Sequence, residues 1–166
     1  MITLNDLTSL KINGKIYQKT IERDEGKMVV ESKRKEKTCC FYVSEFHLEM
    51  ILVPYINEKI EENITILSQR KLRETAEILI SKINLKQENK EKILKLKWDG
   101  EEKIKENSNI IIIGSKEYIK SKNQEISDKN PRSIIDCYDF EEEKDNMNEI
   151  IKDYEKTLNT LGKNNF

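Results

Sequence analysis

The polar residues best placed to bind a ligand lie at the ends of short apolar segments, each of which has the composition of a β-strand. They are Tyr42, Ser44, Glu45, Ser68, Arg70, Ser115, Lys116 and Asp139. If the apolar segments are parallel strands, their C-terminal ends meet at one edge of a sheet, where open α/β folds bind ligands. Cationic side chains there would neutralise charge on a ligand, and hydroxyl groups would orient it by hydrogen bonds. The set predicts a small polar or anionic ligand.

The serines of this set also have a simpler interpretation. Ser44, Ser68 and Ser115 each precede a predicted helix, and the side-chain oxygen of a serine at that position accepts a hydrogen bond from a free N–H of the first turn. For each serine taken alone, the helix cap is the favoured interpretation. Glu45 likewise fits a surface residue that opens a helix. The ligand hypothesis therefore depends on these residues lying together.

Nucleophilic catalysis and phosphate transfer have no motif in this sequence. Gly114-Ser115-Lys116 lacks the upstream glycine of a phosphate loop, and neither G-x-G-x-x-G nor G-x-S-x-G is present. The only histidine, His47, falls near the start of a predicted helix and is expected to be packed or partly exposed. We expect no catalytic residue. The third-ranked alternative is a small nucleotide-processing enzyme that uses Glu45 for acid–base work.

Metal and cofactor chemistry is not predicted either. The three cysteines, at positions 39, 40 and 137, lack the spacing of zinc ligands. Cys40 and Cys137 fall within predicted strands and are expected to be core residues. The acidic run at 141–143 is interpreted as the solvated first turn of a helix. We therefore expect neither a metal nor a cofactor.

Charge and hydropathy limit the partners that this chain can have. Lys and Arg together number 30, and Asp and Glu together number 31. A general nucleic-acid binder needs a strongly basic surface, so no direct contact with nucleic acid is expected. No apolar run approaches the ~20 residues that span a bilayer, so no membrane contact is expected. An odd number of cysteines without a secretory segment predicts a cytoplasmic location.

Strand-like and helix-like segments alternate along most of the chain. The predicted strands are residues 38–43, 64–67, 109–113 and 133–138, and the predicted helices are residues 45–62, 72–83, 116–122 and 141–158. Continuously apolar strands are typical of a parallel sheet covered on both faces, and apolar residues at helical spacing indicate the helices. We therefore predict a three-layer, Rossmann-like α/β fold with a mainly parallel sheet and helices on both faces.

Three segments do not follow this alternation. Residues 1–37 are predicted as an N-terminal β arm or extension, with β elements at 10–17 and 27–31. Residues 38–162 would form the main domain, and residues 163–166 a frayed tail. Residues 93–98 fit a helix end or an edge strand, and their alternating lysines favour the edge strand. Trp98 is expected to fill a gap in the core, with a partner contact as the alternative.

Two stretches resemble the MEDS domain, the sensory domain of dichloromethane-regulator-type proteins. The first comprises Thr38-Cys39-Cys40-Phe41-Tyr42, Glu45 and Val53-Pro54-Tyr55-Ile56-Asn57-Glu58-Lys59-Ile60, and is similar to the family's opening strand and helix. The second comprises Lys116-Glu117-Tyr118, Asn123 and Ile134-Ile135-Asp136-Cys137-Tyr138-Asp139, and is similar to the family's tyrosine–glutamate helix and its I-C-x-Y-D strand. The resemblance covers about residues 38–162. It departs from the family at Thr38 or Lys37, at Lys59 and at Asp153-Tyr154, where the family has a histidine, a glycine and a histidine–proline pair.

The resemblance implies a domain related to RecA-like ATPases, without their phosphate loop, that senses small molecules and regulates transcription or signalling. Together with the missing catalytic motifs, it leads to the hypothesis of a non-catalytic sensory or regulatory domain. Such a domain would bind its ligand at the strand ends and signal to a protein partner or through a homo-oligomer. The alternative is a ligand-free interaction module that works through a helix face or through residues 10–31. The two hypotheses differ in whether a small molecule stabilises the fold.

Overall fold

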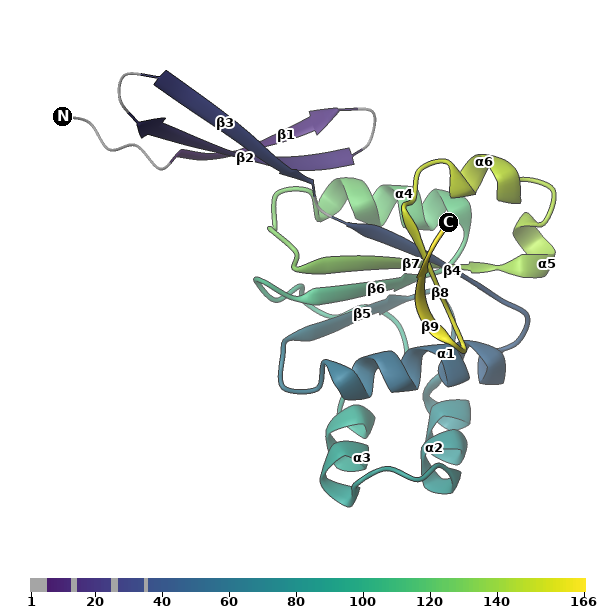
Figure 1. Cartoon of the computed structure of the whole chain (residues 1–166). Coiled ribbons are helices and arrows are strands. Elements are labelled where there is room, and N and C mark those ends of the chain that lie inside the picture. The colour runs from purple at the N-terminus through teal and green to yellow at the C-terminus, as the bar shows by residue number, and fades with distance from the viewer. Residues whose placement is uncertain (1–5, 13–14, 25–26, 35) are drawn as a thin grey trace. The chain divides into compact units, whose positions relative to one another are not determined.

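A computed structural model describes residues 6–12, 15–24, 27–34 and 36–166 of the chain (Figure 1). The chain divides into two units, residues 1–36 and residues 37–166. The first unit is an antiparallel sheet in the order β1-β2-β3, formed by Asp6–Ile12, Lys15–Asp24 and Lys27–Arg34. The β elements predicted at 10–17 and 27–31 fall on these strands. Residues 13–14, within the β element predicted at 10–17, lie outside the described residues.

The second unit is built on a six-stranded sheet in the order β5-β6-β7-β4-β8-β9. The strands are β4 (Lys37–Tyr42), β5 (Ile64–Ser68), β6 (Asn109–Ile113), β7 (Ser133–Asp139), β8 (Lys156–Asn159) and β9 (Gly162–Asn165). Neighbouring strands from β5 to β8 pair in parallel, and only β9 is antiparallel to its neighbour. Helices cover both faces, so the predicted three-layer α/β fold is confirmed.

The helices of one face, with the strand residues that point to them, form the first core. This face carries α1 (Glu45–Glu58), α2 (Arg73–Lys82) and α3 (Gln87–Leu94). The opposite face carries α4 (Lys116–Glu125) and α6 (Met147–Ile151), and α5 (Phe140–Glu143) follows β7 directly. The isoleucines of β6 alternate between the cores: Ile111 and Ile113 join the first, Ile110 and Ile112 the second. Burial on both faces explains why the four residues of β6 after Asn109 are all isoleucine.

The helix predicted over residues 141–158 is wrong. The segment contains two short helices, α5 and α6, and then β8. Ile150 and Tyr154 pack in the second core, but Leu158 packs in the first core on the other face of the sheet. One helix cannot present these residues to both faces, and backbone pairing of β8 with β4 replaces the helical hydrogen bonds.

The tail predicted to fray at 163–166 is also largely ordered by pairing. Lys163, Asn164 and Asn165 lie in β9 and pair with Leu158, Thr157 and Lys156 of β8. Gly162, the first residue of β9, follows the turn at 160–161, and its φ of 102° favours glycine. A tail with no apolar pattern therefore becomes a strand because the edge of β8 offers it hydrogen-bonding partners.

The edge strand predicted at 93–98 is wrong as well. Helix α3 continues to Leu94, and Trp98 is buried with its Nε1 donating to the Ile93 carbonyl oxygen at 3.0 Å. The prediction that Trp98 fills a gap in the core is confirmed by its 1% exposure. The segment after it lies along the outer edge of β5, where the Ser68 N–H donates to the Gly100 carbonyl oxygen at 2.9 Å. This segment satisfies part of the free edge of β5.

Candidate functional site

Two neighbouring parallel strands, β4 and β7, lead to opposite sides of the sheet: β4 is followed by β5 at one edge, and β7 is followed by β8 on the other side of β4. After β4 the chain enters α1 on the first face, and after β7 it enters α5 and then α6, which packs on the second face. Open α/β sheets bind ligands at such a switch point, outside the carboxyl ends of the strands. Figure 1 shows α1 and α4 on opposite sides of the strands that form this edge. The candidate site is this end of β4 and β7.

Arg70 reaches this point from β5, on the far side of β6. Its Nη2 atom lies 2.5 Å from Glu142 Oε1 and 3.7 Å from Asp139 Oδ2. Asp139 is also the N-cap of α5, since its Oδ1 accepts hydrogen bonds from the Glu141 and Glu142 N–H groups at 2.9 and 3.4 Å. Asp139 is therefore fixed by backbone contacts, whereas Glu142 is held mainly by Arg70.

Tyr42, the last residue of β4, lies beside the Arg70 guanidinium. Its side chain is only 2% exposed, and neither its hydroxyl oxygen nor Arg70 Nε has a hydrogen-bond partner of acceptable geometry among the described residues. Burial raises the pKa of Tyr42 to about 12, although the charge of Arg70 acts in the opposite direction. Tyr42 is therefore protonated at neutral pH. The Tyr42 hydroxyl and the Arg70 guanidinium interact with each other, but neither the hydroxyl nor Nε–H makes a hydrogen bond of good geometry with any described residue.

The serines of the predicted set serve the backbone. Ser44 and Ser115 are the N-caps of α1 and α4, where their Oγ atoms accept from the His47 N–H at 3.1 Å and the Tyr118 N–H at 3.2 Å. The cap interpretation is confirmed for these two. It is wrong for Ser68, because the N-cap of α2 is Leu72. Ser68 Oγ instead accepts from the N–H of Arg70 and donates to its carbonyl oxygen, both at 2.9 Å. Ser68 thus fixes the backbone that carries the guanidinium.

The remaining predicted residues do not join this cluster. Glu45 and Lys116 are the first residues of α1 and α4, and both are exposed. Neither makes a hydrogen bond or ion pair with Arg70 or Tyr42 in the described part of the chain. The structure brings together Tyr42, Arg70 and Asp139, and it adds Glu142.

Sequence reasoning missed Glu142 and Gln69. Glu142 was expected to be a solvated first-turn residue, and its only sequence signal is its place just after a strand end. Gln69 precedes Arg70, and its Oε1 accepts from the Ser115 N–H at 2.8 Å. A Cβ atom at Gly114 would lie 2.4 Å from that oxygen, so the glycine makes room for the Gln69 side chain at the end of β6.

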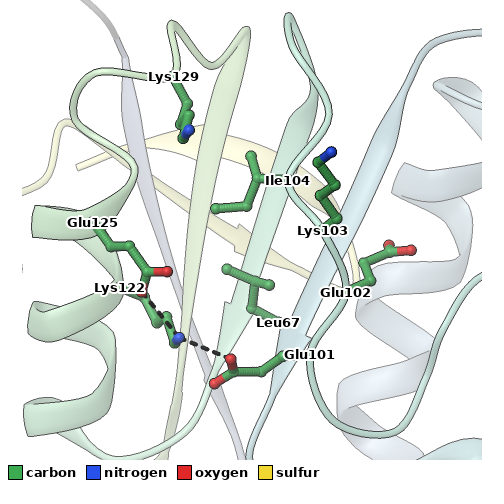
Figure 2. Close-up of a pocket in the computed structure, with 8 residues that line it drawn as sticks. All are labelled: Leu67, Glu101, Glu102, Lys103, Ile104, Lys122, Glu125 and Lys129. Atoms are coloured by element: carbon green, nitrogen blue, oxygen red, sulfur yellow. Dashed lines mark hydrogen bonds and ion pairs between the residues drawn. The ribbon is translucent and has the colours of Figure 1, made fainter.

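A hollow lies between α4 and the segment beside β5, away from this cluster (Figure 2). Its volume is about 230 Å³, and its lining residues are Leu67, Glu101, Glu102, Lys103, Ile104, Lys122, Glu125 and Lys129. Lys122 lies between Glu101 and Glu125, with Nζ–O distances of 2.9 and 3.0 Å. Glu101 also accepts from the Tyr118 hydroxyl at 2.9 Å. These charges are already paired within the hollow, and it contains none of the residues predicted from the sequence.

The cysteines lie in β4 and β7. Cys39, Cys40 and Cys137 are free and buried. Burial raises the pKa of Cys39 to about 12, and it also raises that of Cys137. Such thiols stay protonated at neutral pH and are poor nucleophiles. Among the residues that the structure describes, no group of three or more His, Cys, Asp or Glu side chains could hold a metal ion.

Comparisons with known proteins give no family or relative from which a function could be inferred. The chain matches no protein-family model, no curated protein and no solved structure. Within the described residues, no helix is both long and apolar enough to cross a membrane. The cluster of Tyr42, Arg70, Asp139 and Glu142 is therefore interpreted from its own chemistry.

Proposed function

We propose that this protein is a non-catalytic sensory or regulatory domain. It binds a small polar ligand at the C-terminal ends of its parallel strands and passes the signal to a partner protein in the control of transcription or signalling. The resemblance of two of its stretches to MEDS domains supports the regulatory part of the proposal. The geometry of the strand ends supports the ligand-binding part.

The observation that carries the proposal is the pair of buried donors on Tyr42 and Arg70. A buried polar group without a partner costs about 1–3 kcal/mol, so folded proteins rarely keep one without a reason. Here the Tyr42 hydroxyl and Arg70 Nε–H, which interact with each other but make no hydrogen bond of good geometry, lie at the switch point of the sheet. A ligand oxygen that accepts from both would recover this cost on binding.

The ion pair of Arg70 offers a route for the signal. Glu142 belongs to α5, which begins the connection from β7 to β8. A ligand that contacts Arg70 changes the strength of its pairing with Glu142, and so biases the position of α5. The bias is limited by the difference between the ligand's affinities for the two arrangements. A partner that recognises α5 or α6 would read the change.

Native mass spectrometry of the purified full chain tests the proposal. The protein is measured alone and with a panel of metabolites and nucleotides, as the wild type, Arg70→Ala and Arg132→Ala. Arg132 pairs with Glu62 at the opposite end of β7 and is a control for loss of a surface arginine. A small-molecule mass that is lost in R70A and kept in R132A supports the proposal. A wild-type chain that ignores the whole panel contradicts it.

A second candidate function, a ligand-free interaction module, is favoured by an apolar surface on α1. Phe46 and Met50 lie one helical turn apart in α1 and are 44 and 52% exposed, and Val43, just before the N-cap, is 62% exposed. Exposed apolar patches commonly mark protein contacts. The third-ranked enzyme hypothesis depended on burial of Glu45, and this residue is exposed. Stabilisation by a small molecule separates the first candidate from the second.

A further inference from the structure

We infer that the ligand at Tyr42 and Arg70 is an uncharged molecule with a carbonyl oxygen, such as an amide or a lactam, and not an anion. The inference rests on the proposed function and narrows its ligand class. Two properties of the cluster support this ligand class: its net charge and its unused hydrogen-bond donors.

The charge of Arg70 is already matched. One guanidinium faces two carboxylates, Glu142 at 2.5 Å and Asp139 at 3.7 Å, so these three side chains carry a net negative charge. An anionic ligand would have to displace Glu142 from Nη2 and would still lie beside Asp139, whose carboxylate is held by α5. Like charges at such short range repel strongly in a partly buried site. The arrangement disfavours phosphates and carboxylates.

The hydrogen-bonding capacity that remains consists of donors. Arg70 Nε–H and the Tyr42 hydroxyl are buried, and although the two side chains interact, neither group makes a hydrogen bond of good geometry with a described residue. A carbonyl oxygen has two lone pairs and can accept from both donors without bringing a charge. The carbonyl oxygen of an amide or a lactam would therefore match these two donors.

Glu142 supplies the complementary acceptor. Its side chain is 46% exposed, and Oε1 is the oxygen that faces Arg70. Oε2 makes no hydrogen bond with any of the described residues. An amide N–H next to the ligand's carbonyl group can donate to this oxygen. The carbonyl oxygen of one amide would thus accept from Tyr42 and Arg70, while its N–H group would donate to Glu142.

The variant Glu142→Gln isolates the charge argument. It keeps the size of the side chain and the full charge of Arg70, but it removes the carboxylate that competes with an anion. Glu141→Gln is the matched control, because Glu141 is the neighbouring exposed acid and pairs with Lys144. The probes are inorganic phosphate as the anion and nicotinamide as the neutral amide. Binding to the full chain is measured by isothermal titration calorimetry at millimolar ligand, with circular dichroism as the check on folding.

We expect the wild type and E141Q to bind nicotinamide more tightly than phosphate, and E142Q to gain at least tenfold in phosphate affinity. Tyr42→Phe should weaken nicotinamide binding at least threefold. Phosphate binding to the wild type that equals or exceeds its binding to E142Q overturns the inference, while the ligand site itself stands. Failure of both probes on the wild type and on E142Q overturns the inference and the proposed site together.

Discussion

Tyr154 donates a hydrogen bond of 2.5 Å from its hydroxyl to Oδ2 of Asp136, a carboxylate that is fully buried in the middle of β7. Asn123 of α4 donates to both oxygens of this carboxylate at 3.0 and 3.1 Å, and Lys37 Nζ lies 3.7 Å from Oδ2. Burial raises the pKa of Asp136, and the charge of Lys37 opposes that shift. The carboxylate therefore joins β4, β7, α4 and the segment before β8 by satisfied polar contacts, which indicates a structural role.

Tyr154→Phe should lower the free energy of unfolding by about 2 kcal/mol, because it removes a hydrogen bond to a buried charged group. It also leaves the Tyr138 hydroxyl, 2.6 Å from that of Tyr154, without its partner. Urea denaturation measures the change. Tyr118→Phe is the control, because its hydroxyl bonds to the exposed Glu101 and its loss should cost about 1 kcal/mol or less. Equal losses in the two variants would contradict the structural role of the buried network.

Gly114→Ala tests the close approach at the end of β6. The added Cβ would lie 2.4 Å from Gln69 Oε1 and 2.6 Å from Tyr118 Cδ1, so both side chains must shift. We expect the variant to lose about 1–3 kcal/mol of unfolding free energy, as overpacked sites do. The double variant Gln69→Ala/Gly114→Ala should be less destabilised than the sum of its single variants. Strict additivity in this double-mutant cycle would show that Gln69 does not fill the space above Gly114.

The parts of the fold that sequence predicted are those set by local rules. The isoleucines of β6 require burial on both faces wherever the strand lies, and Ser44 and Ser115 cap the helices that begin directly after them. Such features depend on neighbours within a few residues. They were therefore accessible before the strand order was known.

Only part of the cluster at Arg70 could be predicted from the sequence, because its contacts depend on strand order and not on neighbouring residues. Arg70 and Asp139 were expected at one sheet edge, but the pairing of Arg70 with Glu142 joins residues that are 72 positions apart. It requires β6 to lie between β5 and β7, which no local pattern encodes. β8 shows the same limit, because Lys156–Asn159 becomes a strand through its pairing with β4 and not through its own residue pattern.

Deletion of residues 160–166 tests the strand that replaced the predicted tail. It removes the pairing of β9 with β8 and the hydrogen bond of 3.3 Å from the Phe166 N–H to the Glu155 carbonyl oxygen. We expect a loss of about 1–3 kcal/mol in unfolding free energy, measured by urea denaturation. Leu161→Ser, at a side chain that is 90% exposed, is the control and should change stability by about 0.5 kcal/mol or less. A truncated chain as stable as the wild type would mean that β9 contributes nothing.

Glu49 should make stability depend on pH in the neutral range. Its carboxyl group lies fully buried in α1, accepts a hydrogen bond from the Thr75 hydroxyl of α2 at Oε1, and has no partner at Oε2 among the described residues. Burial raises the pKa of Glu49 from 4.5 to about 7, with a smaller contribution in the same direction from Glu45 and an opposing one from Thr75. The folded protein therefore holds this proton more tightly than the unfolded chain does.

The sign of the effect follows from linkage. The stabilisation due to the proton on Glu49 is complete below pH 4.5 and is lost as the pH rises through about 7. Glu49→Gln keeps the side chain neutral at every pH, so its stability relative to the wild type should increase between pH 5 and pH 8, by about 2 kcal/mol. Urea denaturation at several pH values measures this difference. Glu45→Gln, at the exposed start of the same helix, should give a much flatter difference, and an equally steep one would assign the pH dependence to surface charge instead of the buried carboxyl group.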